Sequence, residues 1–340
     1  MTDRVLVTGG TGYIAGWCIA ELLQRGYEVR TTVRDVTKAD RVRAAVATVV
    51  DPADRLTFTV ADLTDDIGWA DAAAGCRYVL HVASPLDPAP GASDDDLIAP
   101  ARDGTVRVLR AAVHAGVERV VMTSAANTAS PTSYAEQGVT DETLWTDLDA
   151  PGLPAYRRSK TMAERAAWDH MATAPGGTTL ATVLPGAVFG PLLDRHTVGS
   201  VGVIARMLSG AMPGTPKIGL EVVDVRDLVD LHLRAMTSPA AAGQRFLGTG
   251  ESLWMGDIAK LLRDGLGADA AKVPHRTLPN ALVRLMARRR PELRGILPGL
   301  GRRNRHSTEK AERVLGWSRR PVADTILDCG RSLLAHGVVR

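Results

Sequence analysis

The sequence predicts an α/β protein built on a doubly wound parallel sheet, with a smaller, mostly C-terminal lobe. Short runs rich in β-branched residues alternate with helix-like stretches up to residue 184. After Pro185, glycines and prolines multiply and the alternation is lost. The 340 residues are 45% hydrophobic and 23% charged, the balance of an ordinary globular protein that is long enough for two lobes.

Six runs are strand candidates. Each is followed by turn residues or a helix start, and right-handed crossovers would bring all their C-terminal ends to one edge of the sheet. Ligands of doubly wound sheets bind at that edge. The candidates span residues 4–8, 28–33, 56–60, 78–82, 120–123 and 180–184.

The second lobe interrupts the first in our interpretation. Residues 222–228 are predicted as a strand that ends at a helix start, so the chain is expected to return to the first lobe near 221–250. We therefore assign residues 1–184, with this return, to one domain. Residues 185–220 and 251–340 form the other lobe.

The first strand runs directly into a glycine-rich loop, and apolar periodicity then continues as a helix. Glycines permit a tight turn and let backbone N–H groups approach a pyrophosphate, whose charge also suits a helix N-terminus. The order strand, glycine loop, helix predicts a Rossmann-type dinucleotide-binding domain, although a tight turn without ligand is the alternative. The expected contacts come from Gly9, Thr11, Gly12, Tyr13 and Ile14.

Arg34 ends the second strand candidate, with Asp35 beside it and Lys38 nearby. The adenosine ribose is expected there. A guanidinium can bind a 2′-phosphate through two hydrogen bonds and a lysine adds a point charge, which favours NADPH over NADH. Asp35 leaves two alternatives open, because it could bind a free ribose hydroxyl or pair with Arg34. A solvated charge cluster is the alternative without a ligand.

Two further strand ends are candidate cofactor contacts. Asp62 and Leu63 follow the third strand, where a carboxylate can accept from the adenine amino group and an apolar neighbour can cover the ring. Small residues close the fourth strand and leave room for the pyrophosphate and the nicotinamide ribose. They are Val82, Ala83 and Ser84, whereas His81 is interpreted as a packed strand residue.

Tyr156 and Lys160 lie four residues apart in a helix-like stretch, so both side chains share one helix face. Reducing a carbonyl needs a hydride on carbon and a proton on oxygen, and a phenol with a pKa of about 10 is a poor acid at neutral pH. A neighbouring ammonium lowers that pKa. Because this stretch lies between two strand candidates downstream of the glycine loop, we interpret the pair as catalytic rather than as amphipathic surface.

Together these motifs resemble the extended short-chain dehydrogenases/reductases, in particular the group of dihydroflavonol reductase, cinnamoyl-CoA reductase and yeast-type carbonyl reductase. The resemblance covers essentially the whole chain. It also rests on the segments 184–191, 223–228 and 315–317. It implies that Tyr156 donates the proton, that Lys160 tunes it and holds the ribose, and that Pro185 and Val188 dock the nicotinamide carboxamide.

Two positions depart from the pattern of this family. The third glycine of the loop falls on Ala15, which is small enough to fit. The family usually has Thr-Ser-Ser where this chain has Thr123-Ser124-Ala125, and the second serine binds the substrate oxygen. We expect Ser124 to replace it as a catalytic residue, with Asn127, Thr128 or water as alternatives, and Thr123 to contact the cofactor. A structural role of Ser124 is a nearly equal alternative.

The predicted activity is NADPH-dependent reduction of a small hydrophobic aldehyde or ketone, that is, a carbonyl reductase or ketoreductase. The substrate loops would span residues 85–93, 130–154 and 190–213, with Leu86, Leu192, Leu193 and Met207. The arginine-rich segment 276–305 could hold the phosphates of a CoA thioester. Leu282, Leu285 and Met286 instead favour a packed helix with a solvated basic face.

Two rival functions remain open at this stage. One is an NAD-dependent epimerase, dehydratase or hydroxysteroid dehydrogenase of the same fold, and the other is a nucleotide-sensing regulator without catalysis. A net charge of +3 does not indicate a nucleic-acid partner, and the three cysteines show no metal-ligand spacing. No run reaches the roughly 20 apolar residues of a membrane span. We expect a cytoplasmic monomer or homodimer without a metal.

Overall fold

The computed structural model describes residues 2–85, 94–131, 138–196 and 199–339. Its centre is a seven-stranded sheet in the order β11-β7-β5-β4-β1-β2-β3, and every neighbouring pair is parallel. The order reverses between β1 and β4, which is the place where such sheets bind ligands. The strands are β1 (Arg4–Val7), β2 (Glu28–Val33), β3 (Leu56–Val60), β4 (Tyr78–His81), β5 (Arg119–Thr123), β7 (Thr179–Pro185) and β11 (Gln244–Gly248).

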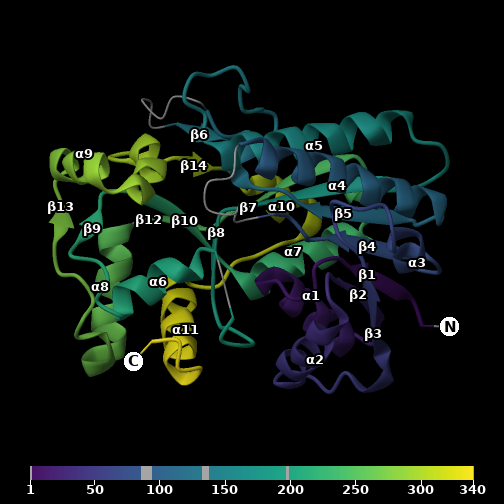
Figure 1. Cartoon of the computed structure of the whole chain (residues 1–340), viewed down its shortest axis with the longest axis horizontal. Helices are drawn as coiled ribbons and strands as arrows, with labels where there is room; N and C mark the ends of the chain where they lie inside the picture. The colour runs from purple at the N-terminus through teal and green to yellow at the C-terminus, as the bar shows by residue number, and fades with distance from the viewer. Residues whose placement is uncertain (1, 86–93, 132–137, 197–198, 340) are drawn as a thin grey trace.

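Helices cover both faces of this sheet (Figure 1). One hydrophobic core joins one face to α1 (Tyr13–Gln24), α2 (Ala39–Ala47) and α7 (Val225–Thr237). A second core joins the other face to α3 (Trp69–Ala73), α4 (Asp95–His114) and α5 (Ala155–Thr173). Because helices cover both sides of the sheet, its central strands are almost entirely buried, including every residue of β4 and β5.

The second lobe has its own small sheets and its own core, and lies at the left of Figure 1. Three strands pair in the order β12-β10-β8, and β13 pairs with β9. The strands are β8 (Ala187–Phe189), β9 (Thr215–Pro216), β10 (Gly219–Asp224), β12 (Glu251–Trp254) and β13 (Thr277–Leu278). The helices are α6 (Val201–Leu208), α8 (Met255–Leu266), α9 (Asn280–Arg289) and α11 (Val322–Ala335).

Three later segments tie the lobe to the large sheet. α7 and β11 return the chain to the sheet, while β10 stays in the lobe. α10 (Glu309–Leu315) packs into the core of the first face, although we assigned residues 251–340 to the lobe. The indole of Trp317, just after α10, donates a 2.7 Å hydrogen bond to the carbonyl of Asp227 in α7, which fixes this docking. β14 (Arg305–His306) pairs in parallel with β6 (Val139–Thr140).

The short 3₁₀ segments complete the chain. They are η1 (Val36–Lys38), η2 (Ala53–Arg55), η3 (Ala126–Ala129), η4 (Pro239–Ala241), η5 (Gly267–Ala270) and η6 (Pro291–Gly299). All six expected strands are present to within one residue at each end, and the doubly wound parallel sheet is confirmed. The predicted strand within 222–228 ends at Asp224, where α7 begins.

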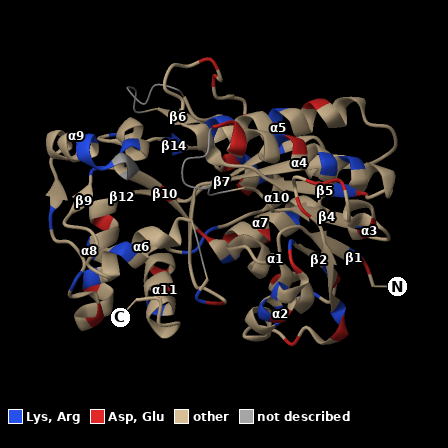
Figure 2. Cartoon of the chain, in the orientation of Figure 1, with Lys and Arg blue, Asp and Glu red and all other residues tan. Residues whose placement is uncertain are grey.

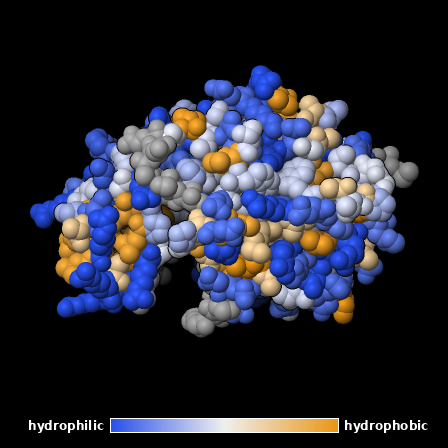
Figure 3. Space-filling model, turned by 90° about the horizontal axis from the view of Figure 1, so that it is seen from above, coloured by the Kyte–Doolittle hydropathy of each residue, from blue (hydrophilic) through white to orange (hydrophobic). Residues whose placement is uncertain are grey.

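The packing of α9 differs from our expectation. Val283 and Ala287 face the protein, whereas Leu282 and Leu285 are exposed. Lysines, arginines and acidic residues are otherwise spread over both parts of the molecule (Figure 2). Seen from above, hydrophobic residues form separate patches among hydrophilic ones (Figure 3). None of the helices within the described ranges is long and apolar enough to cross a membrane.

Candidate active site

The glycine loop is held in place by the ends of the neighbouring strands. Thr32 of β2 accepts two hydrogen bonds from the loop. The backbone N–H of Gly9 donates to Thr32 Oγ1 at 2.9 Å, and the backbone N–H of Gly10 donates to the Thr32 carbonyl at 2.9 Å. Thr31 Oγ1 in turn donates to the Val7 carbonyl at 2.7 Å. These bonds fix the loop before any ligand arrives.

Two glycines of this loop have no room for a side chain. Gly9 adopts a φ of +73°, which L-residues rarely take. A Cβ at Gly10 would lie 2.4 Å from Thr31 Oγ1, far inside contact distance. The loop therefore requires glycine for its own packing.

The N-terminus of α1 fits an anionic group. Its N-cap is Gly12, which has no side chain to bond the first-turn N–H groups of a twelve-residue helix. Those donors and the helix dipole favour a phosphate. Ala15, in the place of the third family glycine, is fully buried and is accommodated in the core. The loop thus fits the pyrophosphate of a dinucleotide.

The tip of β2 presents Arg34 as an exposed side chain next to Asp62. The charge of Arg34 contributes to a lowered pKa of Asp62, although the hydrogen bond from Thr64 is the larger cause. Asp35 is engaged locally, because its carboxylate accepts the N–H of Thr37 at 2.9 Å and caps η1. Arg34 and Asp35 are both exposed at the strand tip, and one carboxylate oxygen of Asp35 is engaged in the cap of η1.

The other residues expected around the adenosine surround the same strand ends. Lys38 is exposed at the end of η1, and Leu63 is half-buried after β3. Leu63 packs onto α4 at Gly104, where a Cβ would lie 2.6 Å from the Leu63 Cβ. Arg34 and Lys38 thus follow β2, and Asp62 and Leu63 follow β3, at the ends of two paired strands.

Thr8 joins the ends of β1 and β4 across the switch point. Its hydroxyl accepts the backbone N–H groups of Val82 at 3.1 Å and Ala83 at 3.0 Å, and bonds His81 Nδ1 at 3.0 Å. His81 is buried, also bonds Thr105, and has its pKa lowered to about 3 by burial. It is a neutral packed residue in the place we expected. Val82, Ala83 and Ser84 are half-buried beside the glycine loop.

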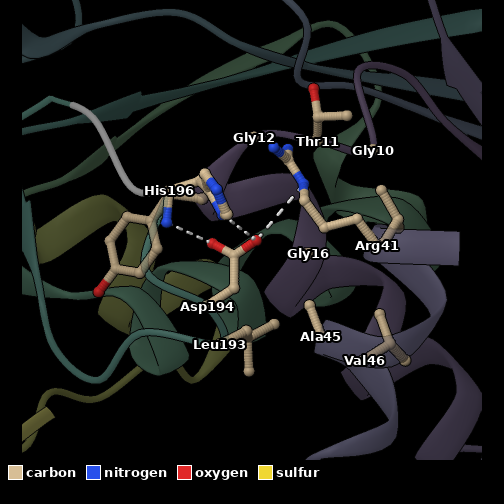
Figure 4. A pocket seen from close by; sticks show the side chains of 12 residues that line it. Gly10, Thr11, Gly12, Gly16, Arg41, Ala45, Val46, Leu193, Asp194 and His196 are labelled. Carbon is tan, nitrogen blue, oxygen red and sulfur yellow. Dashed lines mark hydrogen bonds and ion pairs between the residues drawn. The ribbon is translucent and has the colours of Figure 1, made fainter. Parts of the chain in front are cut away.

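A small cavity lies against the glycine loop, between α2 and the segment after β8 (Figure 4). Arg41 of α2 and His196 both face Asp194, at 3.5 Å in each case, and the N–H of His196 donates to Asp194 at 2.9 Å. Thr11 and Gly12 line the same cavity. Our sequence analysis missed Arg41, and the signal for it was its place one helical turn after Lys38.

Tyr13 and Ile14 are the first two residues of α1, and their side chains pack mainly against the protein. Both pack against the core of the first face, and the hydroxyl of Tyr13 is buried without a partner among the described residues. Burial raises the pKa of this phenol well above its ordinary value. Tyr13 nevertheless lines the small cavity beside the glycine loop.

Tyr156 faces a cavity with a volume of about 710 Å³. It stands in the first turn of α5, which packs closely on α4 because Ala163 and Ala167 are small and buried. The side chain is 37% exposed because it opens onto this cavity, yet the surrounding protein raises the pKa of its phenol. The sequence predicted that Lys160 would lower this pKa, and that direction is wrong for this structure because burial is the cause that acts on the phenol. Ala125, Asn127 and Pro185 line the cavity with it.

Lys160 lies one turn further along α5 and is only 5% exposed. Its ammonium donates a 3.4 Å hydrogen bond to the carbonyl of Thr123 at the end of β5. Burial lowers the pKa of Lys160 to about 8, although the charge of Glu164 opposes the shift. The ammonium is therefore held at the edge of the sheet, one helical turn from Tyr156, and not in bulk solvent.

The hydroxyl groups at the end of β5 turn away from the cavity. Ser124 is 2% exposed and donates a 2.6 Å hydrogen bond to Glu164, which Thr128 also bonds at 2.6 Å. Glu164 is itself paired with Arg245 at 2.8 Å. Thr123 Oγ1 bonds His232 at 2.7 Å. A catalytic role of Ser124 stays a prediction that requires this buried network to open.

The remaining expected contacts lie around the start of the lobe. Pro185 ends β7 at the cavity, and Val188 is buried in β8. Leu192 and Met207 belong to the lobe core rather than to the cavity wall. Leu193 lies at the glycine loop, where its Cδ1 would be 3.1 Å from a Cβ at Gly16. Leu86 falls outside the described residues.

The cavity also has a polar wall that our sequence analysis missed. It contains Ser130, Glu221, Asn304 and His306, from segments up to 176 residues apart. No sequence spacing could indicate it. Across residues 2–85, 94–131, 138–196 and 199–339, no group of three His, Cys, Asp or Glu side chains could hold a metal ion.

Comparison with known proteins identifies the family. Residues 5–247 match the NAD dependent epimerase/dehydratase family. The chain is 35% identical to cinnamoyl-CoA reductase 1 of Oryza sativa subsp. japonica over 263 residues, covering 76% of this chain and 75% of that protein. It is 32% identical to dihydroflavonol 4-reductase of Zea mays over 267 residues, covering 76% of this chain and 73% of that protein.

A solved structure shares the fold over the whole chain. Yeast methylglyoxal/isovaleraldehyde reductase Gre2, complexed with NADPH, has a TM-score of 0.81 at 24% identity and covers 99% of this chain and 100% of its own. These three proteins are named as reductases, which agrees with the predicted oxidoreductase. The match to the family over residues 5–247 confirms the predicted resemblance, and this chain belongs to the NAD dependent epimerase/dehydratase family, as an extended short-chain dehydrogenase/reductase.

Proposed function

We propose that this protein is an NADPH-dependent carbonyl reductase in which Tyr156 protonates the oxygen of an aldehyde or ketone. One observation carries the proposal: Tyr156 opens onto a cavity of about 710 Å³, while Lys160 is buried one turn behind it. A cavity of this size matches a small organic substrate. The reductase names of the relatives support the same reaction class.

The glycine loop, Asp62 and Arg34 would hold the cofactor. When bound, its reduced nicotinamide would supply the hydride. Arg34 favours NADPH, because a guanidinium can bind a 2′-phosphate through two hydrogen bonds and Asp35 is already engaged with η1. Arg41 adds a second cation beside the glycine loop. Val82, Ala83, Ser84, Pro185 and Val188 would line the cleft on the nicotinamide side.

Protonation is the step that the chain itself performs. Burial raises the pKa of Tyr156, so its phenol keeps its proton at neutral pH until a substrate oxygen gains negative charge. The charged form of Lys160 stabilises the phenolate left behind. A pKa of about 8 leaves Lys160 charged at neutral pH, which this role requires.

Asn127 is our candidate for the second hydrogen bond to the substrate oxygen. It lines the cavity beside Tyr156, whereas Ala125 has no donor, and Ser124 and Thr128 are both bonded to Glu164. An amide N–H can donate to a carbonyl oxygen as a serine hydroxyl does. Ser124 remains the competing candidate.

A cofactor titration and a substrate panel test the proposed function. Purified protein should bind NADPH more tightly than NADH and oxidise NADPH when a panel of aldehydes and ketones is added. Tyr156→Phe should bind NADPH normally and lose turnover, while Tyr27→Phe, which alters a tyrosine packed at the sheet, serves as the matched control. Binding without turnover on any carbonyl would favour a nucleotide-sensing regulator. Tight NAD binding with epimerase or dehydratase activity would favour the other rival.

A further inference from the structure

The helix α9 presents an apolar strip to solvent on its outer face. Val283 and Ala287 are buried against the lobe, whereas Leu282 and Leu285 are 41% and 56% exposed. The two leucines lie three residues apart, so they share one face of the helix. Single exposed leucines are common on protein surfaces, so the strip alone does not indicate a partner.

Exposed arginines surround this strip. Arg288 and Arg289 follow Leu285 by three and four residues, so they lie on the same outer side of α9. Arg284 and Arg290 are also exposed. With the described part of the chain as the only source of partners, none of these four guanidinium groups forms an ion pair. The outer face of α9 therefore combines apolar side chains with positive charges that the protein leaves unneutralised.

The positive charge of the protein is concentrated in this region. Residues 276–305 contain nine arginines and Glu292 as their one acidic residue, whereas the whole chain has a net charge of +3. The rest of the sequence is therefore net negative. Figure 1 places α9 at one end of the molecule, and blue lysine and arginine residues mark it in Figure 2. This end of the lobe is thus suited to an anionic partner.

The apolar strip and the arginines together favour one kind of partner. A second copy of this chain packed through its own α9 would bring arginine against arginine, which like charges oppose. A nucleic acid would pair with the arginines and leave the leucines in water. A folded protein would need a groove that fits the helix. The surface of an anionic bilayer accepts both groups, because lipid phosphates bind guanidinium groups and the acyl boundary covers the leucines.

We propose that the outer face of α9 docks on an anionic membrane surface. Leu282 and Leu285 would enter the boundary between headgroups and acyl chains, while Arg284, Arg288 and Arg289 bind the lipid phosphates. The contact is peripheral, because α9 has ten residues and a membrane span needs roughly twice as many. The proposal does not depend on the proposed reductase function.

Co-sedimentation with vesicles tests the docking. The whole protein is mixed with vesicles of phosphatidylcholine alone, or of phosphatidylcholine with phosphatidylglycerol, at increasing salt. We expect binding only where phosphatidylglycerol is present, and weaker binding as salt screens the arginines. One arginine near an anionic surface corresponds to about fivefold in affinity, so Arg288→Gln combined with Arg289→Gln should weaken binding by about 25-fold. Leu285→Ser should weaken it by about tenfold.

Matched changes elsewhere control for net charge and for apolar surface. Arg110→Gln combined with Arg313→Gln removes the same charge from exposed positions of α4 and α10. Ile67→Ser removes an apolar side chain that is 77% exposed outside the lobe. Both control proteins should bind vesicles within about twofold of the unchanged protein, because their charges and side chains lie away from the docking face. Equal melting temperatures show that the variants are folded.

Each outcome supports or overturns the docking. Failure to bind phosphatidylglycerol vesicles, or binding that the α9 variants leave unchanged, would overturn it. Binding that needs Arg288 and Arg289 but is the same in Leu285→Ser would show attraction without insertion, and the docking of α9 would again be wrong. A DNA duplex and coenzyme A are titrated in parallel. If either binds through these arginines while vesicles do not, the patch serves a soluble phosphate ligand instead. Oxidation of NADPH is assayed separately, so its failure leaves the vesicle result intact.

Discussion

Lys160 should destabilise the folded protein at neutral pH. Its side chain is almost fully buried, and burial lowers its pKa from 10.5 to about 8. One unit of pKa corresponds to about 1.4 kcal/mol, so carrying the charge in the folded state costs about 3 kcal/mol of the free energy of unfolding. Lys160→Met keeps a long apolar stem and removes the charge. We therefore expect the variant to be more stable at pH 7 and to be inactive.

The pH dependence of that gain identifies its cause. Below pH 8, Lys160 is charged in both the folded and the unfolded protein, so the folded protein bears the full free-energy cost of the buried charge. Between pH 8 and 10.5 the folded state releases its proton first, so the free energy of unfolding of the unchanged protein rises with pH. The advantage of Lys160→Met should therefore shrink across this window and vanish above it.

Melting temperatures measured from pH 6 to 11 provide the assay, with activity measured in parallel. Lys260→Met is the matched control, because Lys260 is exposed and forms a surface pair with Asp264 at 2.5 Å, and a surface pair of this kind contributes at most about 0.5 kcal/mol. A Lys160→Met protein that melts at the same temperature as the unchanged protein at pH 7 would refute the reasoning. An advantage that does not change with pH would refute it as well.

Four further changes probe the cofactor side and the substrate oxygen. Arg34→Ala should weaken NADPH by about tenfold or more, the loss of one charge-assisted pair, and weaken NADH far less, measured by fluorescence titration; equal losses would place the 2′-phosphate elsewhere. Gly10→Ala should weaken both cofactors and lower stability by about 1–3 kcal/mol, since its Cβ would lie 2.4 Å from a Thr31 oxygen, while Gly177→Ala, which has open space, should do neither. Asn127→Ala should lower kcat by about tenfold without changing NADPH affinity. Ser124→Ala should instead mainly lower the melting temperature, and the reverse pattern would restore Ser124 as the catalytic residue.

The sheet and the glycine loop were predictable because their signals are local. A parallel strand covered on both faces is rich in apolar and β-branched residues, and a loop whose backbone approaches a phosphate is rich in glycine, so both features appear directly in the order of residues. Gly10 illustrates this, since its requirement comes from Thr31 on the adjacent strand of a regular sheet. The strand ends were likewise fixed by local turn residues.

The polar wall of the substrate cavity was not predictable because its residues come from segments that are far apart in the sequence. Ser130, Glu221 and His306 meet only because β10 and β14 of the lobe come against the segment after η3. Neither the spacing nor the composition of these segments indicates that they come together in the fold. The departure at Ala125 was visible in the sequence, but its consequence depended on where the neighbouring hydroxyls point.

Glu164 explains why Ser124 was the harder residue to interpret. A buried carboxylate needs several donors, and this one collects Ser124, Thr128, Thr182 and Arg245. The network therefore competes with any substrate for the Ser124 hydroxyl, and removing that hydroxyl leaves a buried charge with one donor fewer. A serine in this network is retained for folding whether or not it contacts substrate, so its presence in the motif Thr123-Ser124-Ala125 does not by itself indicate catalysis. Among the described hydrogen bonds, none involves the side chain of Asn127. Asn127 can therefore bond a substrate in the cavity without giving up a hydrogen bond of the protein core.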